Sequence, residues 1–296
     1  MKTTVVVVSW NTRELLLACL AALESHAPGV PVWVVDNASS DESAAAVAER
    51  FPAVRVIANV ENVGFARANN QVLRQVTTSY AWLLNPDTEI RPGALEGLEA
   101  ALDDHPNAAV AGSALFNPDE SPQACSFPFP TPLGTWAEWL YLPAGLARRR
   151  DVLFKLAPRR TEGETDWVLG ASLLVRKAAM EAVGLLDEGY FMYSEELDWC
   201  ARFREAGWAT RLALASEVVH HGGASTRQVP DQMLISLFRT RARFFRRHAP
   251  AWWFGPLMWV GAAWNAGYAK LRGIHAPTFA IARAISDTPP ASGSLP

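Results

Sequence analysis

Strand and helix signals alternate along the first part of the chain, and this alternation limits the folds that it can adopt. Four β-branched or apolar runs have the length of buried strands, and helix-start signals lie between them. The four runs are Thr4–Val8, Val32–Val35, Val54–Ile57 and Tyr80–Leu84. Strands that alternate with helices favour parallel pairing with right-handed crossovers. We therefore predict an α/β fold in which helices flank a mostly parallel, doubly wound sheet.

Two capping boxes mark the predicted helix starts. Asn11 is expected to cap the first helix, with Glu14 returning the bond. The run Ser39–Glu42 is expected to open a second, alanine-rich helix, with Ser39 more suited to capping than to ligand binding. A third helix is predicted over about residues 66–76.

Composition fits one large domain with an appendage. The chain has 296 residues, half of them apolar, and a formal charge of −3, which argues against general nucleic-acid binding. Its three cysteines lie far apart, which predicts reduced, packed thiols rather than disulfides or a zinc site. They are Cys19, Cys125 and Cys200. The apolar stretch Val5–Val8 is too short for a signal-peptide core, so we expect the catalytic domain to stay in the cytoplasm.

An acidic turn, Asn85-Pro86-Asp87, directly follows the Tyr80–Leu84 run. Proline fixes the turn, and the turn places one carboxylate at the carboxyl edge of the predicted sheet, where open α/β folds bind ligands. Asn-Pro-Asp is also ordinary turn chemistry. The other motifs of the chain decide between these two interpretations.

The nucleotide-binding fingerprints of other α/β proteins are missing. The turn after the first strand, Ser9-Trp10-Asn11, contains no glycine, so neither the dinucleotide fingerprint nor the P-loop is present. Asp36 follows the second strand, where its carboxylate could accept a hydrogen bond from a base or a ribose, or could simply stabilise the turn.

Seven motifs, taken in their order and spacing, resemble glycosyltransferase family 2. They cover residues 3–226 and are most similar to rhamnosyltransferases that act on dTDP-rhamnose. The motifs are Val-Ser-Trp-Asn (8–11), Val-Asp-Asn-Ala-Ser-Ser-Asp (35–41), Asn-Val-Gly-Phe-Ala (62–66) with Asn69-Asn70, Leu-Leu-Asn-Pro-Asp (83–87), Trp-Val-Leu-Gly-Ala-Ser-Leu-Leu (167–174), Phe-Met-Tyr-Ser-Glu-Glu-Leu-Asp-Trp-Cys-Ala-Arg (191–202) and His-His-Gly-Gly-Ala-Ser (220–225).

The resemblance implies a GT-A fold and an inverting sugar transfer from a nucleotide diphosphate to an acceptor hydroxyl. It also implies a divalent ion, Mg²⁺ or Mn²⁺, held by an Asp-x-Asp motif. Here Asn85 replaces the first aspartate, which leaves Asp87 as the charged ligand. One carboxylate can suffice where substrate phosphates complete the coordination shell. His220 is the candidate second ligand, with His221 as the alternative match.

The donor-binding residues implied by the resemblance come from four of the motifs. The loop that contains Gly64 opens a helix, whose N-terminal amides suit a phosphate or nucleotide edge. Gly64 could instead supply only an unusual φ. The donor-binding set is Ser9, Asn11, Asp36, Asn37, Asn62, Gly64, Phe65, Asn69 and Asn85.

Direct displacement at a sugar carbon needs a carboxylate that takes the proton of the acceptor hydroxyl. By the family pattern Glu196 is this base, while Glu195 and Asp198 are acceptor-orienting groups. Neighbouring side chains of a helix diverge by about 100°, so Glu195 and Glu196 cannot share one task. An acidic first helical turn and an i,i+4 pair between Asp198 and Arg202 would explain the same residues structurally.

Trp167 and Gly170 are expected on the acceptor side of the site. A tryptophan can stack on a sugar face, and it is equally a common core residue.

The predicted organisation has a GT-A domain over 1–228, a helical region over 229–285 and a disordered tail over 286–296. Within the first domain, the Pro- and Trp-rich stretch 113–164 is expected to be an irregular insert that covers the acceptor. In the helical region, arginines such as Arg246 and Arg247 precede the aromatic stretch Ala251–Ala269. This pattern is typical of membrane-surface attachment, although two helices packed back on the domain would also explain it.

We therefore predict an inverting, metal-dependent glycosyltransferase of cell-envelope polysaccharide synthesis. Its expected donor is dTDP-rhamnose, and its expected acceptor is a glycan or a lipid-linked sugar at the cytoplasmic face of the inner membrane. A UDP- or GDP-sugar donor is the alternative, as is a non-catalytic sugar-nucleotide-binding protein, because both acidic motifs depart from the common form. The oligomeric state stays open, and a homodimer is one option.

Overall fold

The computed structural model describes residues 1–140, 161–222, 230–249, 252–273 and 277–286. The chain divides into two compact units. The first, which we call the sheet unit, contains Met1–Phe127, Pro158–Phe191 and Glu195–Gln228. The second, which we call the helical unit, contains Pro128–Ala157, Met192–Ser194 and Val229–Pro296.

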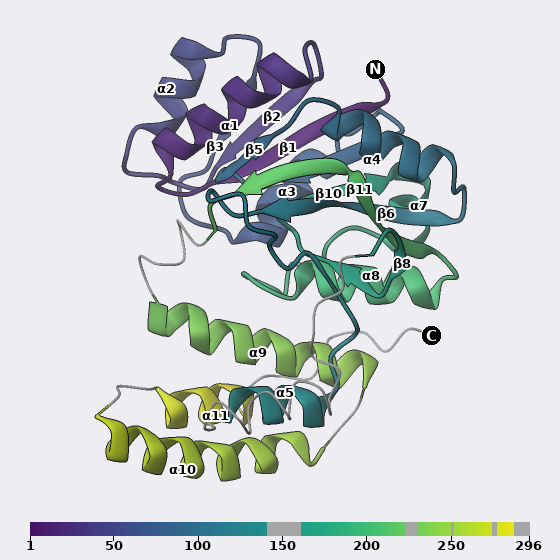
Figure 1. The fold of residues 1–296 in the computed structure, drawn as a ribbon. Coiled ribbons are helices and arrows are strands. Elements are labelled where there is room, and N and C mark those ends of the chain that lie inside the picture. The colour runs from purple at the N-terminus through teal and green to yellow at the C-terminus, as the bar shows by residue number, and fades with distance from the viewer. Residues whose placement is uncertain (141–160, 223–229, 250–251, 274–276, 287–296) are drawn as a thin grey trace. The chain divides into compact units, whose positions relative to one another are not determined.

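The first four strands form a parallel half-sheet in the order β3-β2-β1-β4. Figure 1 labels β1, β2 and β3 of this half-sheet. They are β1 (Thr3–Ser9), β2 (Val32–Asp36), β3 (Arg55–Ala58) and β4 (Tyr80–Leu84). Every residue of β1 and β4 is buried, because helices cover both faces of a parallel sheet. The α/β prediction is confirmed here, and each predicted strand lies where its apolar run stands.

The remaining strands extend the sheet beyond β4 in mixed directions. They are β5 (Thr88–Ile90), β6 (Ala108–Phe116), β8 (Gly163–Thr165), β10 (Ser172–Arg176) and β11 (Ala209–His220). β10 pairs antiparallel to both β4 and β6, and β11 runs parallel to β6 but antiparallel to β5 and β8. The expectation of a mostly parallel sheet therefore holds only for the first half. A short second sheet pairs β7 (Ser126–Phe127) with β9 (Trp167–Val168).

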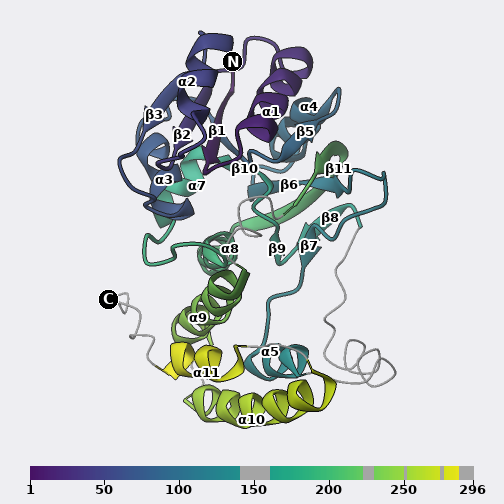
Figure 2. The same cartoon turned by 90° about the vertical axis from the view of Figure 1, so that its left-hand side faces the viewer.

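Helices cover the two faces of the sheet, with α1 and α4 on one side and α3 and α7 on the other (Figure 2). The helices of the sheet unit are α1 (Arg13–His26), α2 (Ser43–Arg50), α3 (Phe65–Leu73), α4 (Ala94–Asp103), α7 (Lys177–Val183) and α8 (Glu195–Glu205). Val5 and Val7 of β1 share one core with Leu16 and Leu20 of α1. Each buried side chain of this kind contributes roughly 1.5–3 kcal/mol.

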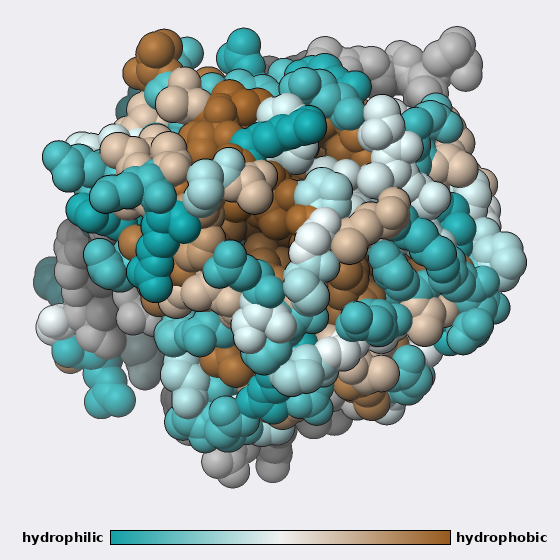
Figure 3. All heavy atoms as spheres, turned by 90° about the horizontal axis from the view of Figure 1, so that it is seen from above, coloured by the Kyte–Doolittle hydropathy of each residue, from teal (hydrophilic) through white to brown (hydrophobic). Residues whose placement is uncertain are grey.

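Polar residues dominate the surface seen from above, around a central area of hydrophobic side chains (Figure 3).

The three cysteines are buried and unpaired. Burial raises the pKa of the Cys19 and Cys200 thiols to about 12. The prediction of packed, reduced thiols is confirmed.

The first helix starts differently from the prediction. Asn11 has a φ of 51° and does not cap α1; its side-chain oxygen accepts from the Ser40 amide at 2.7 Å. The cap comes from another loop, because the Asp41 carboxylate accepts from the Arg13 amide at 2.9 Å. Ser39 likewise caps no helix, since its hydroxyl accepts from the Asn11 amide. These bonds join the loops that follow β1 and β2, a long-range arrangement that a local capping pattern cannot reveal.

The stretch 113–164 is predicted to be irregular, but part of it forms regular elements. It contains the end of β6, all of β7, the start of β8 and helix α5 (Pro132–Trp139), which Thr131 caps by accepting from the Gly134 amide. Proline density masked these elements, because proline also suits the first turn of a helix. Residues 141–160 of this stretch lie outside the described residues.

Within its described residues, the helical unit packs four helices through aromatic contacts. They are α5, α9 (Pro230–His248), α10 (Phe254–Arg272) and α11 (Thr278–Ser286). Trp139 of α5 lies 5.3 Å from Phe238 of α9 between ring centroids, and Asn265 of α10 donates to the Trp139 carbonyl. Among the helices that the structure describes, no apolar stretch is long enough to cross a membrane. Residues 287–296 of the predicted tail lie outside the described part of the chain.

Candidate active site

Asp87 and His220 meet where β4 and β11 end. The turn after β4 is held by the Asn85 amide, which donates to the Ala171 carbonyl at 2.9 Å, and by Thr88, whose hydroxyl donates to the Asn85 carbonyl at 2.7 Å. His220 ends β11 and pairs in register with Thr88. Both side chains are buried, and His220 Nε2 lies 3.4 Å from Asp87 Oδ1.

The second histidine points elsewhere. The His221 amide donates to the Asp87 carbonyl at 2.9 Å, but its ring Nε2 lies 2.7 Å from Glu89 Oε1. The structure therefore brings His220, rather than His221, to the Asp87 carboxylate.

A divalent ion fits the Asp87–His220 pair. No group of three or more His, Cys, Asp or Glu side chains suited to a metal occurs within the described residues. Mg²⁺ and Mn²⁺ sites need few protein ligands where substrate phosphates and water complete the shell. One carboxylate and one imidazole that converge are such a partial set, so Asp87 and His220 are the residues that would hold the ion.

Gln123 also contacts the Asp87–His220 pair, although it is not among the predicted site residues. Its Oε1 lies 2.7 Å from His220 Nδ1. The residue stands in a Pro-rich stretch with no catalytic motif, so no local signal could have identified it.

Asp36 ends β2 and keeps one oxygen available. The side chain is buried, Oδ2 accepts from the Ser39 amide at 3.1 Å, and Oδ1 has no hydrogen-bond partner among the described residues. A buried carboxylate oxygen without a partner is costly, so a ligand that donates to it would be favoured. This geometry agrees with the predicted donor-binding role.

Other residues of the predicted donor set lie behind this edge. Asn37 accepts from Asn59 at 2.9 Å and donates to the Gly64 carbonyl at 3.3 Å, which ties two loops together. Ser9 is fully buried and its hydroxyl bonds to Thr12 at 2.9 Å. Donor binding by Ser9 stays a prediction, and the bond to Thr12 ties the end of β1 to the start of α1.

The glycine loop is locked against the segment that precedes α8. Asn62 Oδ1 accepts from the Gly64 amide at 3.0 Å, and the Phe65 amide donates to the Phe191 carbonyl at 2.7 Å. Gly64 has a φ of 84°, and a Cβ built on it would lie 2.5 Å from the Phe191 oxygen. Gly64 therefore serves a close backbone approach, while the Phe65 amide is already bonded to protein. Asn69, on the next turn of α3, is buried and donates to the Phe65 carbonyl.

Glu196 lies in the first turn of α8, above Gly170. A Cβ on Gly170 would lie 3.6 Å from Glu196 Cγ, so the loop before β10 packs directly against the carboxylate stem. The next residue, Ala171, accepts from the Asn85 amide. These contacts bring Glu196 and the Asp87 turn to the same edge of the sheet. We call Asp36, Asp87, Glu196 and His220 the edge cluster.

Glu195 faces the interior. It is 4% exposed, and its Oε2 has no hydrogen-bond partner in the described part of the chain. Burial, together with the adjacent negative charge of Glu196, raises the pKa of the Glu195 carboxyl well above its usual value. A neutral acid is the form that such a site favours.

Asp198 is bonded within the protein, which agrees with the structural explanation of this residue, and its acceptor-orienting role stays a prediction. Its side chain is completely buried and Oδ2 accepts from Arg202 Nε at 2.8 Å. Arg202 also donates to the Val183 and Leu185 carbonyls at 2.9 and 2.7 Å. The pair anchors α8 to the end of α7, because each of the three guanidinium nitrogens of Arg202 donates to a protein oxygen.

Trp167 packs rather than presenting an open ring. It is buried on β9 and stacks on Phe127 with ring centroids 4.7 Å apart. Its predicted acceptor contact would need this stack to open, whereas Gly170, three residues on, already lies beside Glu196.

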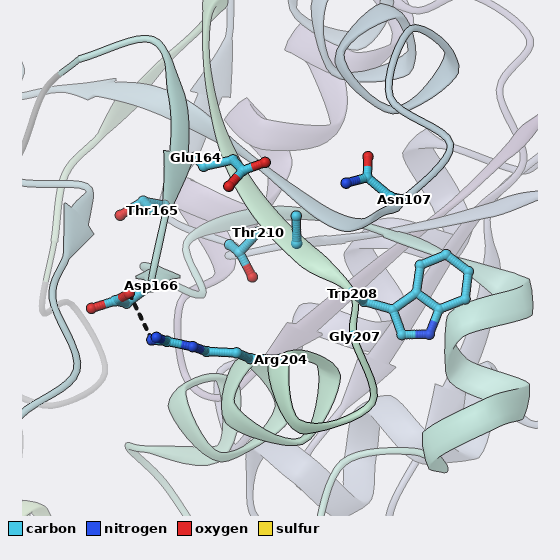
Figure 4. A pocket seen from close by; sticks show the side chains of 9 residues that line it. Asn107, Glu164, Thr165, Asp166, Arg204, Gly207, Trp208 and Thr210 are labelled. Carbon is cyan, nitrogen blue, oxygen red and sulfur yellow. Dashed lines mark hydrogen bonds and ion pairs between the residues drawn. The ribbon is translucent and has the colours of Figure 1, made fainter.

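A separate pocket of about 370 Å³ opens at the other end of β11. Figure 4 shows Thr210, Glu164 and Asp166 around it, with Asp166 bonded to Arg204 at 3.0 Å. β11 bulges between Ala213 and Glu217, and its residues Thr210 and Val219 pair with Val110 and Phe116 of β6. At a strand rise of ~3.3 Å per residue along β6, Thr210 is roughly 20 Å from the end of β11 that carries His220. The pocket is therefore distinct from the edge cluster.

Known proteins are similar to this chain in sequence and in fold. The model of glycosyl transferase family 2 matches residues 4–126. N-acetylglucosaminyl-diphospho-decaprenol L-rhamnosyltransferase of Mycobacterium tuberculosis (strain CDC 1551 / Oshkosh) is 31% identical over 264 residues, covering 83% of this chain and 84% of that protein.

Two solved structures have the same fold at low identity. The mannosyltransferase PcManGT of Pyrobaculum calidifontis, in complex with GDP-Man and Mn²⁺, aligns with a TM-score of 0.56 and 16% identity, covering 96% of this chain and 86% of that one. GalNAc-T7 with UDP, GalNAc and Mn²⁺ aligns with a TM-score of 0.61 and 14% identity; the match covers 83% of this chain but 48% of that one, so this chain spans about half its length. On the strength of the mycobacterial relative and the matching GT-A architecture, the chain belongs to glycosyl transferase family 2 and is a glycosyltransferase.

Proposed function

We propose that this protein transfers rhamnose from dTDP-rhamnose, with inversion, to a hydroxyl of a lipid-linked diphosphate sugar. The observation that carries this proposal is the edge cluster, which gathers a partial metal site and a carboxylate base on one sheet edge. The name of the mycobacterial relative, which is similar over most of both chains, supports rhamnose as the sugar and a diphospho-polyprenol sugar as the acceptor.

The chemistry divides among the residues of the edge cluster. A bound divalent ion would neutralise charge on the departing diphosphate, and Asp87 and His220 would hold it. Glu196 takes the proton of the acceptor hydroxyl as that oxygen bonds to the anomeric carbon. The bond from this carbon to the diphosphate oxygen breaks, and its electron pair leaves with the nucleotide. Asp36 accepts a hydrogen bond from the nucleotide.

The alternatives use the same fold. The two solved structures contain UDP and GDP-Man, so a UDP- or GDP-sugar is the competing donor. Asn85 and Glu196 stand where the family more often has aspartate, which keeps a non-catalytic nucleotide-binding role as the second alternative. Turnover separates the last alternative from the others.

The test combines donor binding with turnover. We expect dTDP-rhamnose, but not UDP- or GDP-sugars, to raise the melting temperature of the full chain in the presence of Mn²⁺. At 100 times the dissociation constant, a ligand stabilises by about 2.7 kcal/mol. The shift should disappear in Asp87→Ala, whose metal-free melting temperature should match wild type.

If only UDP- or GDP-sugars raise the melting temperature, the donor is one of these sugars rather than dTDP-rhamnose. Donor binding without transfer to an N-acetylglucosaminyl-diphospho-polyprenol acceptor would favour the non-catalytic role.

We further propose that α10 attaches the protein to the cytoplasmic face of the inner membrane. Its exposed side chains include Trp259, Val260, Trp264 and Leu271, with exposures of 42, 62, 54 and 87%. Indole rings favour the membrane interface, and cations near the helix end favour anionic headgroups. Lys270 and Arg272 supply such charges in the last turn. A diphospho-polyprenol acceptor would lie in the same surface.

Vesicle sedimentation tests this attachment with the full chain. We expect binding to vesicles that contain phosphatidylglycerol and a marked loss of binding in the double variant Trp259→Ser, Trp264→Ser. Val60→Ser is the matched control, because Val60 is a fully exposed apolar residue of the sheet unit. Equal binding by wild type and the double variant would contradict attachment through α10.

A further inference from the structure

The loop between β6 and β7 holds a hydrogen-bond chain whose direction is fixed at one end by a carboxylate. The Ser121 hydroxyl and amide both donate to Asp119, at 2.5 and 3.0 Å. These bonds lower the pKa of the Asp119 carboxyl, which therefore only accepts. Since the single hydroxyl proton of Ser121 is used, its oxygen must accept from Asn117 Nδ2, which lies 2.9 Å away.

The donor and acceptor roles fixed at Asp119 determine those of each later hydrogen bond as far as His220. With Nδ2 of Asn117 toward Ser121, its Oδ1 accepts from Gln123 Nε2 at 3.0 Å, and the same Nε2 donates to the His220 carbonyl at 3.4 Å. The oxygen of Gln123 thus faces the imidazole, with Oε1 2.7 Å from Nδ1. An amide oxygen only accepts, so Nδ1 must carry the proton.

From this chain we propose that Gln123 is a positioning residue that fixes the tautomer of His220. With the proton on Nδ1, the neutral ring presents a lone pair at Nε2, 3.4 Å from Asp87 Oδ1. Two lone-pair ligands then converge on one point, as a divalent ion requires. The proposal rests on the proposed metal-dependent function and adds a residue outside every motif that the sequence shares with the family.

The backbone explains why Gln123 can do this. Its amide donates to the Leu115 carbonyl at 2.9 Å, and Phe116 pairs with Pro122 across the loop. The segment therefore turns back and pairs antiparallel with the end of β6, the neighbour of β11 in the sheet. The other tautomer would place two acceptors, Nδ1 and Oε1, against each other. Turning the amide over would break both bonds that Gln123 Nε2 donates.

The first test reads the tautomer directly. In metal-free, full-length protein labelled with ¹⁵N-histidine, we expect Nδ1 of His220 to be protonated, whether or not Nε2 also carries a proton. A His220 protonated at Nε2 alone would overturn the proposal, whatever any variant does. This reading needs neither turnover nor a folded variant.

The second test reads Mn²⁺ affinity by calorimetry in the presence of dTDP. Removing a partner that orients a metal-bound histidine typically weakens the metal by 10–100-fold. We expect Gln123→Met, of similar length without an acceptor oxygen, to show a loss of about this size. Gln123→Glu, which keeps an acceptor toward Nδ1, should stay within about threefold of wild type, because its oxygen preserves the same tautomer.

His221→Gln is the matched control, since the neighbouring ring pairs with Glu89 and should leave Mn²⁺ affinity unchanged. Equal Mn²⁺ affinity in wild type and a folded Gln123→Met would overturn the proposal. Absence of Mn²⁺ binding in wild type would instead overturn the metal-dependent function, while the tautomer measurement still decides the role of Gln123.

Discussion

The two sides of helix α8 use carboxylates in opposite ways. Glu196 lies at the sheet edge above Gly170, whereas Asp198, one half-turn later, is buried and bonded to Arg202. Sequence alone places them in one acidic run and assigns both to the acceptor side of the site. The hydrogen bonds distinguish them, because the Asp198 carboxylate accepts from Arg202 and so helps to anchor α8. The difference teaches that site residues are recognised by which polar atoms the fold has already bonded, rather than by charge density.

The largest effect expected from this comparison is on turnover. Glu196→Gln removes the proposed base and should lower the transfer rate by roughly 10²–10⁴-fold, the usual contribution of general base catalysis. Donor binding and melting temperature should stay near wild type, because glutamine keeps the size and shape of the Glu196 side chain that packs against Gly170. Glu181→Gln, on the exposed face of α7, is the control for a lost surface charge. A variant that loses donor binding together with turnover would make Glu196 structural and erase the contrast.

On the buried side the effect should fall on stability. Asp198→Ala leaves Arg202 buried without its partner and should lower the free energy of unfolding by about 3–5 kcal/mol. Chemical denaturation measures it. The matched pair is Lys177–Glu181, which has the same i,i+4 spacing but exposures of 37 and 66%. There Glu181→Ala should cost less than about 1 kcal/mol. Similar losses in the two variants would show that burial does not distinguish the pairs.

Gly64 sharpens the comparison at the backbone level. Gly64→Ala should destabilise the protein through both a left-handed φ and an overlap with the Phe191 oxygen. Gly93→Ala is the control, because Gly93 has a φ of 81° but nothing near its absent Cβ. The control should lose only the conformational term of about 1–2 kcal/mol, and Gly64→Ala should lose more. Equal losses of unfolding free energy in the two variants would show that the Gly64 loop moves away from Phe191 at no energetic cost.

The smallest effect concerns Glu195 and depends on pH. Because burial and Glu196 raise its folded pKa, the folded state holds a proton that the unfolded state releases above its own, ordinary pKa. This contribution to stability is full below the unfolded pKa and declines as pH rises toward the folded one. Glu195→Gln should therefore raise the melting temperature at pH 8 more than at pH 5. A pH-independent difference would contradict the neutral form of Glu195.

Much of this arrangement is predictable from local pattern. The four apolar runs place β1 to β4, and the turn after β4 puts Asp87 at the sheet edge, because strand direction fixes the edge at which a loop emerges. Gln123 is beyond such patterns, since its role depends on a hydrogen-bond chain that closes only after β6 and β11 pair. The cap of α1 by Asp41 and the burial of Asp198 depend likewise on contacts between distant segments.

The pairing of β11 between β6 and β5 also bears on how the enzyme is made. During synthesis, Asp87 leaves the ribosome long before the strand that carries His220, and the neighbouring contact of His221 with Glu89 spans 132 residues. A nascent chain that ends before β11 has its first four strands but only one half of the candidate metal pair. Because β11 is the last strand of the sheet along the chain, its pairing with β5 both completes the sheet and brings His220 to Asp87. On the proposed mechanism, truncated or misassembled chains would therefore be inactive, so that activity would report on the completion of folding.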